Sequence, residues 1–400
     1  RIAEVLHQYG LSLDPHRIVS TLSVGERQRI EIVRALLLNP RLLIMDEPTS
    51  VLTPQEVGQL FETLRALSKS GCSILYISHK LHEIQELCEA ATILRGGKVV
   101  GECDPKKESS RSMAEMMIGA SLKTVEKDGG RKFGEEKFVV TSLTLPGEGD
   151  FGVPLNDISF TVRAGEIFGI AGVAGNGQNE LLLALSGEVT SDVGNAVQLD
   201  GEPIGSHGTT PRRFVGLCAV PEERNGHGAV PEFTLCDNSI LTARNRKSMV
   251  RYGVINSSIA MGYTEDVIEK FDVKTTGPTS TAGSLSGGNL QKYLMGREIM
   301  QTPEVLVVSQ PTWGVDAGAA AAIHQALVDL AEGGSAIVVI SQDLDELLAI
   351  CDHMAVINEG RLSKTYNVGE VSIDEIGLLM GGVHGDPFAT AEMTEAVHAH

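Results

Sequence analysis

The sequence predicts an α/β fold made of two related domains, each built on a mainly parallel sheet, and three observations support this. Apolar segments of strand length alternate with amphipathic helical segments along much of the chain. A set of short motifs occurs twice, separated by one constant spacing. The apolar segment Ile167–Ala171 leads into a glycine-rich loop and then an apolar helix, which is the context of a phosphate-binding loop.

Composition places the chain among globular proteins. It has 400 residues, enough for two or three domains, of which 42% are hydrophobic, and its formal net charge is −19. An acidic surface argues against wrapping nucleic acid or adhering to anionic lipid. No apolar run approaches the roughly 18–20 residues of a membrane-spanning helix, and the six cysteines form no CxxC pair. These features predict reduced thiols in a cytoplasmic protein.

The first part of the chain predicts two helices. Residues 2–9 carry apolar side chains at helical spacing, and residues 22–26 form a Ser/Gly turn that opens a second helix, which ends near Asn39-Pro40. A glycine-bearing turn at a helix N-terminus exposes backbone N–H groups that suit a phosphate. Most turns of this kind are only helix caps, so the turn alone does not establish a site.

The next apolar strand, at residues 42–46, ends in two adjacent carboxylates, Asp46 and Glu47, and Pro48 stops the strand there. In open α/β sheets, ligands bind at the carboxyl ends of the strands. The pair is therefore a candidate catalytic site, with an ordinary acidic turn as the alternative reading.

The remaining elements of the first domain continue the alternation of helices and strands. We place this domain at residues 1–102. The predicted elements are a helix at 55–69, a strand at 73–78 ending at His79, a helix at 81–87, and strands at 91–94 and 98–101.

A change in composition separates the two domains. Residues 103–136 are rich in Lys, Glu, Ser and Gly and predict a linker with one helix around residues 113–118. A second domain is predicted at residues 137–382, and a polar, disordered tail at 383–400. The first strands of the second domain are expected at 138–143, 158–162 and 167–171, followed by an apolar helix at 181–185.

The two domains are related by an internal repeat with a constant offset of 263 residues. The offset is the same at four motifs, since 285 − 22 = 309 − 46 = 342 − 79 = 360 − 97 = 263. The register holds from residue 22 to residue 97 without a gap, which chance does not readily produce. Identical pairs include Ser23/Ser286, Gly25/Gly288, Gln28/Gln291, Arg34/Arg297, Pro40/Pro303, Pro48/Pro311 and Thr49/Thr312.

The second copy contains a glycine loop that has no counterpart in the first. The loop begins at Gly172, continues through Gly175 and Gly177, and is followed by Gln178 and Asn179. Its equivalent in the first copy falls at 172 − 263 = −91, before the first residue. The expectation is a fragment of a longer protein, lacking roughly 120 N-terminal residues.

Together these motifs resemble the ATP-binding subunits of ABC transporters, and among them the double-domain subunits of simple-sugar and nucleoside importers. Residues 285–289, Leu-Ser-Gly-Gly-Asn, match the family's signature loop, and residues 22–26 are the same loop with Val24 in place of a glycine. Residues 42–48 match Walker B with its catalytic glutamate, and His79 matches the switch histidine. The resemblance implies tandem P-loop NTPase domains of ABC type, each a mainly parallel sheet with a helical subdomain.

The resemblance also implies that the two domains pair head to tail within the chain and enclose two composite ATP sites. In the first site, Asp46 would hold Mg²⁺, Glu47 would activate the attacking water, and His79 would contact the γ-phosphate. The second domain would close this site with its signature loop and with the loop after its own Walker B. The residues assigned to that role are Ser286, Gly287, Gly288 and Asp316.

By the same resemblance, the second site combines the glycine loop of the second domain (Gly172, Gly175 and Gly177) with Ser23 and Gly25 of the first domain. Each change from the family pattern falls on a part that serves this site. We therefore expect one working site and one that at most binds nucleotide. The replacements are Gln178 for the phosphate-binding lysine, Asn179 for the Mg²⁺-binding Ser/Thr, Ser309 for aspartate, Gln310 for glutamate, Gln342 for histidine and Thr53 for the aspartate of the facing loop.

The function that the resemblance implies is ATP hydrolysis coupled to import of a nucleoside or simple sugar, with ATP and Mg²⁺ as cofactors. The partners would be the membrane permease subunits and, indirectly, a solute-binding protein, at the cytoplasmic face of the membrane. Residues 220–238 resemble the region that couples to the permease, and an ordinary surface loop is the alternative. Gln178 and Gln310 favour nucleosides over sugars, by resemblance only.

Two other function classes are open to a tandem ATPase. A soluble ABC-type ATPase acting on ribosomes or DNA usually has two working sites and basic surfaces, and this chain has neither. A non-catalytic scaffold would not need Asp46, Glu47 and His79 together. Import is therefore the favoured function, with no nucleic-acid partner.

Overall fold

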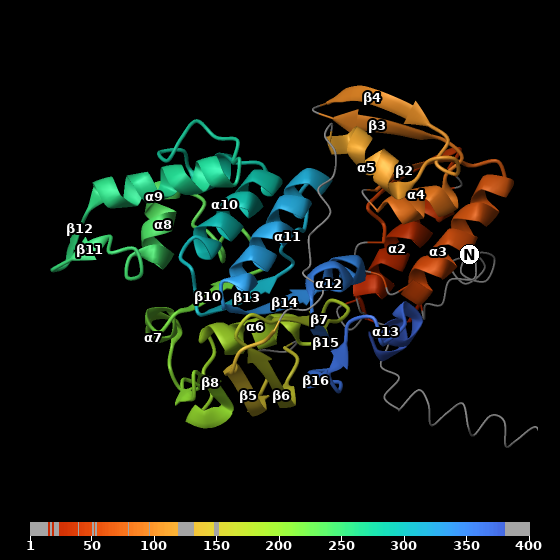
Figure 1. The fold of residues 1–400 in the computed structure, drawn as a ribbon. Helices are drawn as coiled ribbons and strands as arrows, with labels where there is room; N and C mark the ends of the chain where they lie inside the picture. The colour runs from red at the N-terminus through yellow and green to blue at the C-terminus, as the bar shows by residue number, and fades with distance from the viewer. Residues whose placement is uncertain are drawn as a thin grey trace, which may run out of the picture.

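The protein is described here from a computed structural model (Figure 1). The structure describes residues 15–16, 18–19, 24–38, 40–49, 52, 54–78, 80–95, 97–118, 132–147 and 152–380. Some predictions lie outside these residues: the helix at 2–9, Ser23, Thr53, His79 and the tail at 383–400.

The described residues up to 118, called the first half below, form a small α/β unit, as their alternating pattern predicts; residues 132–380 are called the second half. Strands β1 (Leu42–Asp46) and β2 (Ser73–Ile77) pair in parallel. Strands β3 (Ala91–Arg95) and β4 (Lys98–Cys103) pair antiparallel, because the two residues between them are too few for a crossover. The helices are α2 (Val24–Leu37), α3 (Pro54–Lys69), α4 (Leu81–Leu87) and α5 (Ser110–Ile118).

Helix α3 supplies much of the core of this half. Leu60, Leu64 and Leu67 recur at helical spacing and are buried in one cluster with Leu43 and Met45 of β1. Helix α5, which the sequence places inside the linker, packs against α4 and β3.

The second half contains the predicted parallel sheet. Its strands follow the order β10–β13–β14–β7–β15, and the central ones are buried on both faces, as is typical of parallel sheets covered by helices. Short strands pair antiparallel with β15 at one edge. The strands are β7 (Ile167–Ala171), β10 (Leu217–Val220), β13 (Val305–Ser309), β14 (Ala336–Ser341), β15 (His353–Asn358), β16 (Arg361–Leu362) and β17 (Tyr366–Asn367).

A second sheet, antiparallel, lies under the parallel one, with helix α6 (Gln178–Ser186) between them (Figure 1). Leu181 and Leu185 of α6 share a buried cluster with Phe138 of the antiparallel sheet and Val307 of the parallel sheet. The core of this half therefore depends on α6, the helix that the glycine loop opens. The antiparallel strands, in spatial order, are β6 (Leu155–Arg163), β5 (Glu136–Leu145), β8 (Val197–Leu199) and β9 (Glu202–Pro203).

Helices α8 (Leu235–Ala243), α9 (Ser257–Lys270) and α10 (Gly287–Ile299) gather on the side away from the antiparallel sheet (Figure 1). This group confirms the predicted helical subdomain. A hairpin of β11 (Val250–Arg251) and β12 (Val254–Ile255) connects α8 to α9. The other helices of the second half are α7 (Thr209–Phe214), α11 (Ala317–Glu332), α12 (Leu344–Ile350) and α13 (Ile373–Met380).

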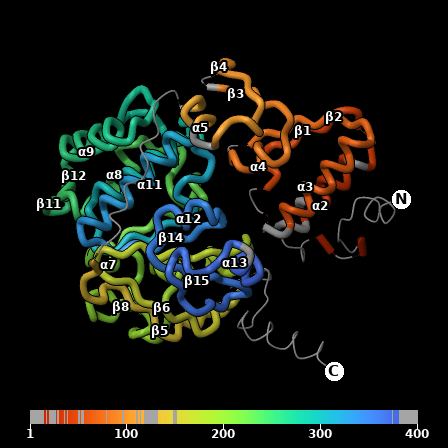
Figure 2. Tube along the Cα trace, turned by 45° about the vertical axis from the view of Figure 1, so that its right-hand side comes forward, coloured from red at the N-terminus to blue at the C-terminus, as the bar shows by residue number. Residues whose placement is uncertain are grey.

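The two halves lie side by side and meet partly through equivalent elements (Figure 2). His82 Nδ1 of α4 lies 3.5 Å from Asp345 Oδ2 of α12, and 345 − 82 = 263, the offset of the repeat. A contact between equivalent positions is typical of two units related by a two-fold axis. Helix α13 also packs against α3, and α11 against α5.

Arg212 caps the C-terminal end of α6 from a fully buried position. Its guanidinium donates to the carbonyl oxygens of Ala184 (2.6 Å), Leu185 (2.7 Å), Gly205 (2.8 Å) and His207 (2.8 Å). Burial lowers the pKa of Arg212 to about 10. Replacing Arg212 by Met is expected to reduce the free energy of unfolding by about 3 kcal/mol, because each buried carbonyl left unpaired costs about 1–3 kcal/mol and removing the buried charge offsets part of that.

Urea unfolding of the Arg212→Met variant measures this loss. The matched control is Arg251→Met, which removes an exposed arginine and should stay within about 0.5 kcal/mol of the unmodified chain. A loss below 1 kcal/mol for Arg212→Met would show that the cap is dispensable.

Candidate functional site

The two acidic residues predicted as catalytic lie at the carboxyl end of β1. Asp46 is exposed, Glu47 is half-buried, and the Glu47 N–H donates to the carbonyl of Ile77 at 2.8 Å. Glu47 has a φ of +44°, a left-handed conformation that non-glycine residues adopt infrequently.

The equivalent position of the second half has the same backbone geometry. Gln310 has a φ of +50°, and its N–H donates to the carbonyl of Ile340 at 2.8 Å. The two copies therefore differ here in side-chain chemistry and not in backbone shape. Ser309, buried at the end of β13, and Gln310 supply a hydroxyl and an amide where the first copy supplies two carboxylates.

The glycine loop of the second half has the geometry of a phosphate-binding loop. Gly175 and Gly177 have φ values of +86° and +107°, which favour glycine, and Gly177 caps α6 without a side chain. A Cβ on Gly172 would come within 2.6 Å of Gln178 Nε2 and 2.8 Å of the Ile357 carbonyl oxygen. Backbone N–H groups at the start of α6 are thus available to an anion.

Gln178, at the position of the lysine, folds back into this loop. Its Nε2 donates to the carbonyl of Val173 at 2.7 Å, and its Oε1 accepts the N–H of Asn176 at 3.0 Å. The side chain is buried and uncharged, and it occupies one of the N–H groups of the loop. Asn179 lines a cavity of about 320 Å³ between α6 and strands β5 and β6, together with Glu180.

The signature loop opens helix α10. Ser286 is its N-cap residue, and Asn289 Nδ2 donates to Ser286 Oγ at 2.9 Å. Gly287 and Gly288 lie in close-packed surroundings, since a Cβ on them would approach Arg224 Nη1 at 2.8 Å and the Gly314 carbonyl oxygen at 3.1 Å.

Asp316 is the N-cap of α11 and accepts the N–H of Ala319 at 3.0 Å. Gln291 of α10 donates to the carbonyl oxygens of Gln310 (3.2 Å) and Pro311 (2.9 Å), so the signature helix is tied to the end of β13. These contacts lie within the second half. Pairing of the signature loop with Asp46 of the first half stays a prediction, as do the roles of Gly25, in the first turn of α2, and of Ser23 and His79.

Sequence reasoning missed two buried carboxylates, Glu83 and Glu346. Thr49 Oγ1 donates to Glu83 Oε1, and Thr312 Oγ1 donates to Glu346 Oε1, both at 2.6 Å. The repeat could have indicated these two residues, because they are glutamates separated by its offset, 346 − 83 = 263.

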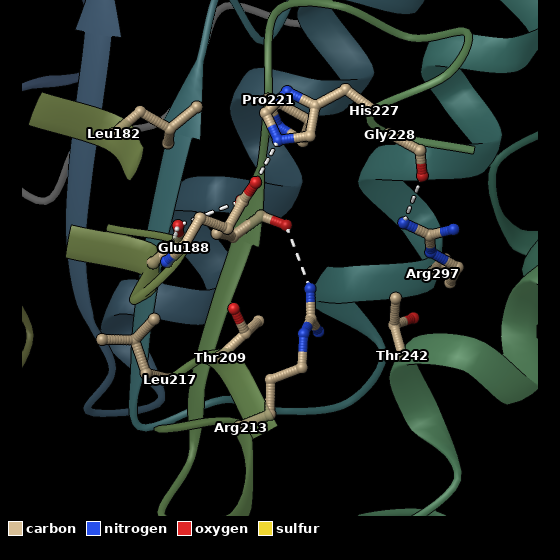
Figure 3. A pocket seen from close by; sticks show the side chains of 12 residues that line it. Leu182, Glu188, Thr209, Arg213, Leu217, Pro221, His227, Gly228, Thr242 and Arg297 are labelled. Carbon is tan, nitrogen blue, oxygen red and sulfur yellow. Dashed lines mark hydrogen bonds and ion pairs between the residues drawn. The ribbon is translucent and has the colours of Figure 1, made fainter. Parts of the chain in front are cut away.

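The segment after β10 lies over a small cavity of about 60 Å³ (Figure 3). His227 Nε2 lies 2.7 Å from Glu188 Oε2, which fixes the segment to the end of α6. On the other side, Arg297 Nη2 of α10 donates to the Gly228 carbonyl at 3.0 Å. The hydrogen bond with Glu188 raises the pKa of His227, and the same bond lowers the pKa of Glu188. The segment thus connects the parallel-sheet core to the signature helix.

Comparison with known proteins agrees with this geometry. The family described as "ABC transporter" matches residues 1–50 and 155–313. The nucleoside import ATP-binding protein NupA of Lactococcus lactis subsp. cremoris is 35% identical, over 96% of this chain and 75% of that protein. The glucose import ATP-binding protein TsgD13 of Haloferax volcanii is 36% identical, over 98% and 71%. The ribose import ATP-binding protein RbsA of Clostridium perfringens is 36% identical, over 95% and 74%.

Solved structures show the same fold at lower identity. A complex of the archaeal ribosome recycling factor aABCE1 with a ribosomal stalk protein gives a TM-score of 0.65 at 19% identity, over 96% of this chain and 72% of that one. A dimeric ATP-binding cassette bound to ADP and Pi gives 0.51 at 18%, over 58% and 100%. Among the described residues, every helix is too short or too polar to cross a membrane. The chain belongs to the ABC transporter family, as an ATPase with two tandem ATP-binding domains of the kind found in sugar and nucleoside import proteins.

Proposed function

We propose that the chain drives import of a nucleoside or simple sugar by hydrolysing ATP at one of two composite pockets. The observation that carries this proposal is the contrast at two equivalent strand ends. Asp46 and Glu47 end β1, whereas Ser309 and Gln310 end β13 on the same backbone geometry. The import names of the relatives support the transport role.

In the first pocket, each side chain has one task. Asp46 is the residue that would hold Mg²⁺, since that hard cation prefers carboxylate oxygen, and the metal would neutralise charge on the transferred phosphoryl group. Glu47 orients the attacking water and takes up its proton. His79 contacts the γ-phosphate, while Ser286 and Gly288 donate to the phosphates from the opposite side. Asp316 borders the same pocket.

In the second pocket, the chemistry of hydrolysis is missing. Ser309, Gln310 and Asn179 do not fit a Mg²⁺ site, because a carboxylate is absent from this set. A lysine–phosphate contact is worth up to about 4 kcal/mol at an effective dielectric near 20, and Gln178 lacks that charge. Losing a general base typically costs about 10²–10⁴ in rate. This pocket at most binds nucleotide.

The first pocket also requires a glycine loop and a helix like α6. The exposed face of β1 supports this requirement: Leu42 and Ile44 are 55% and 59% exposed, whereas the equivalent Val305 and Val307 are fully buried, Val307 in one cluster with residues of α6. A helix equivalent to α6, opened by a glycine loop, would bury the same face of β1.

The permease would dock on residues 220–238, where the segment connects the sheet core to the signature helix. When the two domains close on ATP, movement of α10 would be transmitted to the membrane subunits through the hydrogen bond between Arg297 and Gly228. With the permease bound there, the protein would work at the cytoplasmic face of the membrane, with a solute-binding protein as an indirect partner. Action on ribosomes or DNA is not favoured, because the net charge is −19 and the ribosome recycling factor shares only the fold.

Solute uptake by cells tests the function. Deleting the gene should abolish uptake of one radiolabelled solute among uridine, adenosine, ribose and galactose, and the intact gene should restore it. Unchanged uptake of all nucleosides and simple sugars would contradict the proposal.

A further inference from the structure

We propose that Glu83 is a positioning residue for hydrolysis at the first pocket, joining the loop that carries Glu47 to the end of β2. This inference rests on the proposed function. Neither the motifs nor the family resemblance assigns a role to Glu83.

Glu83 lies on α4 with its side chain 1% exposed, and it gathers three hydroxyl groups. Thr49 Oγ1 donates to Oε1 at 2.6 Å, and Tyr76 OH donates to Oε2 at 2.7 Å. Ser78 Oγ also lies near Oε2, at 3.3 Å. Burial, and then the hydrogen bond to Glu83, raise the pKa of Tyr76, which favours the protonated phenol that donates to Glu83.

The three hydroxyls come from the two segments that carry the catalytic groups. Thr49 is two residues after Glu47, and Ser78 immediately precedes His79 in the sequence. One carboxylate therefore joins the loop after β1 to the end of β2. Glu47 has a strained backbone, which persists only where surrounding contacts fix it.

The second copy repeats the threonine and serine contacts of this arrangement and has a histidine as the third partner. Glu346 is 5% exposed and lies 2.6 Å from Thr312 Oγ1, 2.7 Å from Ser341 Oγ and 3.0 Å from His324 Nε2. Ser341 Oγ is also 3.3 Å from Gln310 Oε1. The serine thus contacts the side chain at the catalytic position. Its equivalent, Ser78, follows Ile77, whose carbonyl accepts the N–H of Glu47.

A buried carboxylate is costly unless it is fully hydrogen-bonded, so an apolar side chain could fill the same volume at lower cost. The carboxylate instead fixes the positions of the segments that carry its donors, because it accepts from several hydroxyl groups at once. Displacing a catalytic group by about 1 Å can cost about 100-fold in rate. Loss of Glu83 should therefore lower the rate of hydrolysis with little effect on ATP binding.

The test compares Glu83→Gln with its repeat equivalent, Glu346→Gln, in the longer protein that includes the expected upstream glycine loop. Glutamine keeps the size but replaces one acceptor oxygen by a donor. We expect Glu83→Gln to lower kcat by about 10- to 100-fold with a change in KM for ATP below about twofold. Glu346→Gln changes the equivalent contacts to Thr312 and Ser341 and should keep kcat within about twofold.

A second pair of variants separates positioning from folding. Thr49→Val removes the hydroxyl and should reproduce the fall in kcat. Thr49→Ser keeps the hydroxyl and should have nearly the kcat of the unmodified protein. The proposal would be overturned if Glu83→Gln and Glu346→Gln lowered kcat equally and lowered the melting temperature equally. An unchanged kcat in Glu83→Gln would also overturn it. If the unmodified protein does not hydrolyse ATP, the proposed function itself fails, which is a distinct result.

Discussion

Replacing Glu47 by Gln is expected to lower ATP turnover by about 10²–10⁴-fold, because the amide cannot take up the proton of the attacking water. The amide has nearly the size of the carboxylate, and Gln310 occupies the same backbone conformation in the second half. Folding and nucleotide binding should therefore be kept. The measurement is steady-state phosphate release by the full-length protein.

Gln310→Ala is the matched control, since it removes the side chain at the equivalent position of the second pocket. We expect this variant to keep turnover within about twofold of the unmodified protein, because the proposed function assigns no hydrolysis to the second pocket. Full turnover in Glu47→Gln, or a comparable loss in Gln310→Ala, would show that the catalytic assignment is wrong.

Replacing Glu298 by Ala is expected to reduce the free energy of unfolding of the second half by about 3–5 kcal/mol, because it leaves buried positive charge unpaired. Glu298 is fully buried on α10. Its carboxylate lies 2.8 Å from Arg213 Nη1 and 2.8 Å from Arg297 Nε, and it accepts from Gln301 Nε2 at 2.9 Å. This cluster fixes the signature helix to the parallel-sheet core. The exposed Glu265→Ala is the control and should change stability by less than about 0.5 kcal/mol.

The same cluster predicts how stability depends on pH. Burial alone would raise the pKa of Glu298, but Arg213 and Arg297 outweigh it and hold that pKa at about 2, below the ordinary 4.5. A depressed pKa stabilises the folded state above pH 4.5, and this contribution is lost as the pH falls from about 4.5 to about 2. Urea unfolding at pH 6 and pH 3 should therefore show a smaller gap between Glu298→Ala and the unmodified chain at pH 3. A gap that does not change between these pH values would contradict the ion pair.

Local patterns predicted the elements best where the apolar segments have sharp ends. The strand at 167–171 and the helix at 81–87 agree with the sequence prediction residue for residue. Strand β5 is longer than its predicted span of 138–143, because pairing with β6 and β8 draws polar flanking residues into the sheet. The helical subdomain was accessible only through the family resemblance, since no local pattern shows that α8, α9 and α10 pack together.

Some features of the candidate site could likewise be predicted from the sequence, and others could not. The acidic end of β1 and the glycine loop could be predicted because the residues of each are adjacent in the sequence. The inward fold of Gln178 and the hydroxyl contacts of Glu83 could not, since they depend on side-chain rotamers and on partners such as Thr49, 34 residues away. Only the offset of the repeat could have indicated Glu83 and Glu346 before the structure.

The central claim is that the only hydrolytic pocket joins Asp46 and Glu47 of the first domain to the signature loop of the second. The most direct measurement is the ATP turnover of Ser286→Arg beside that of Ser23→Arg, each placing a bulky cation in one signature loop. Ser286→Arg should lose at least about 100-fold in turnover, and Ser23→Arg less than about fivefold. A larger loss in Ser23→Arg, or equal losses in both, would contradict the claim.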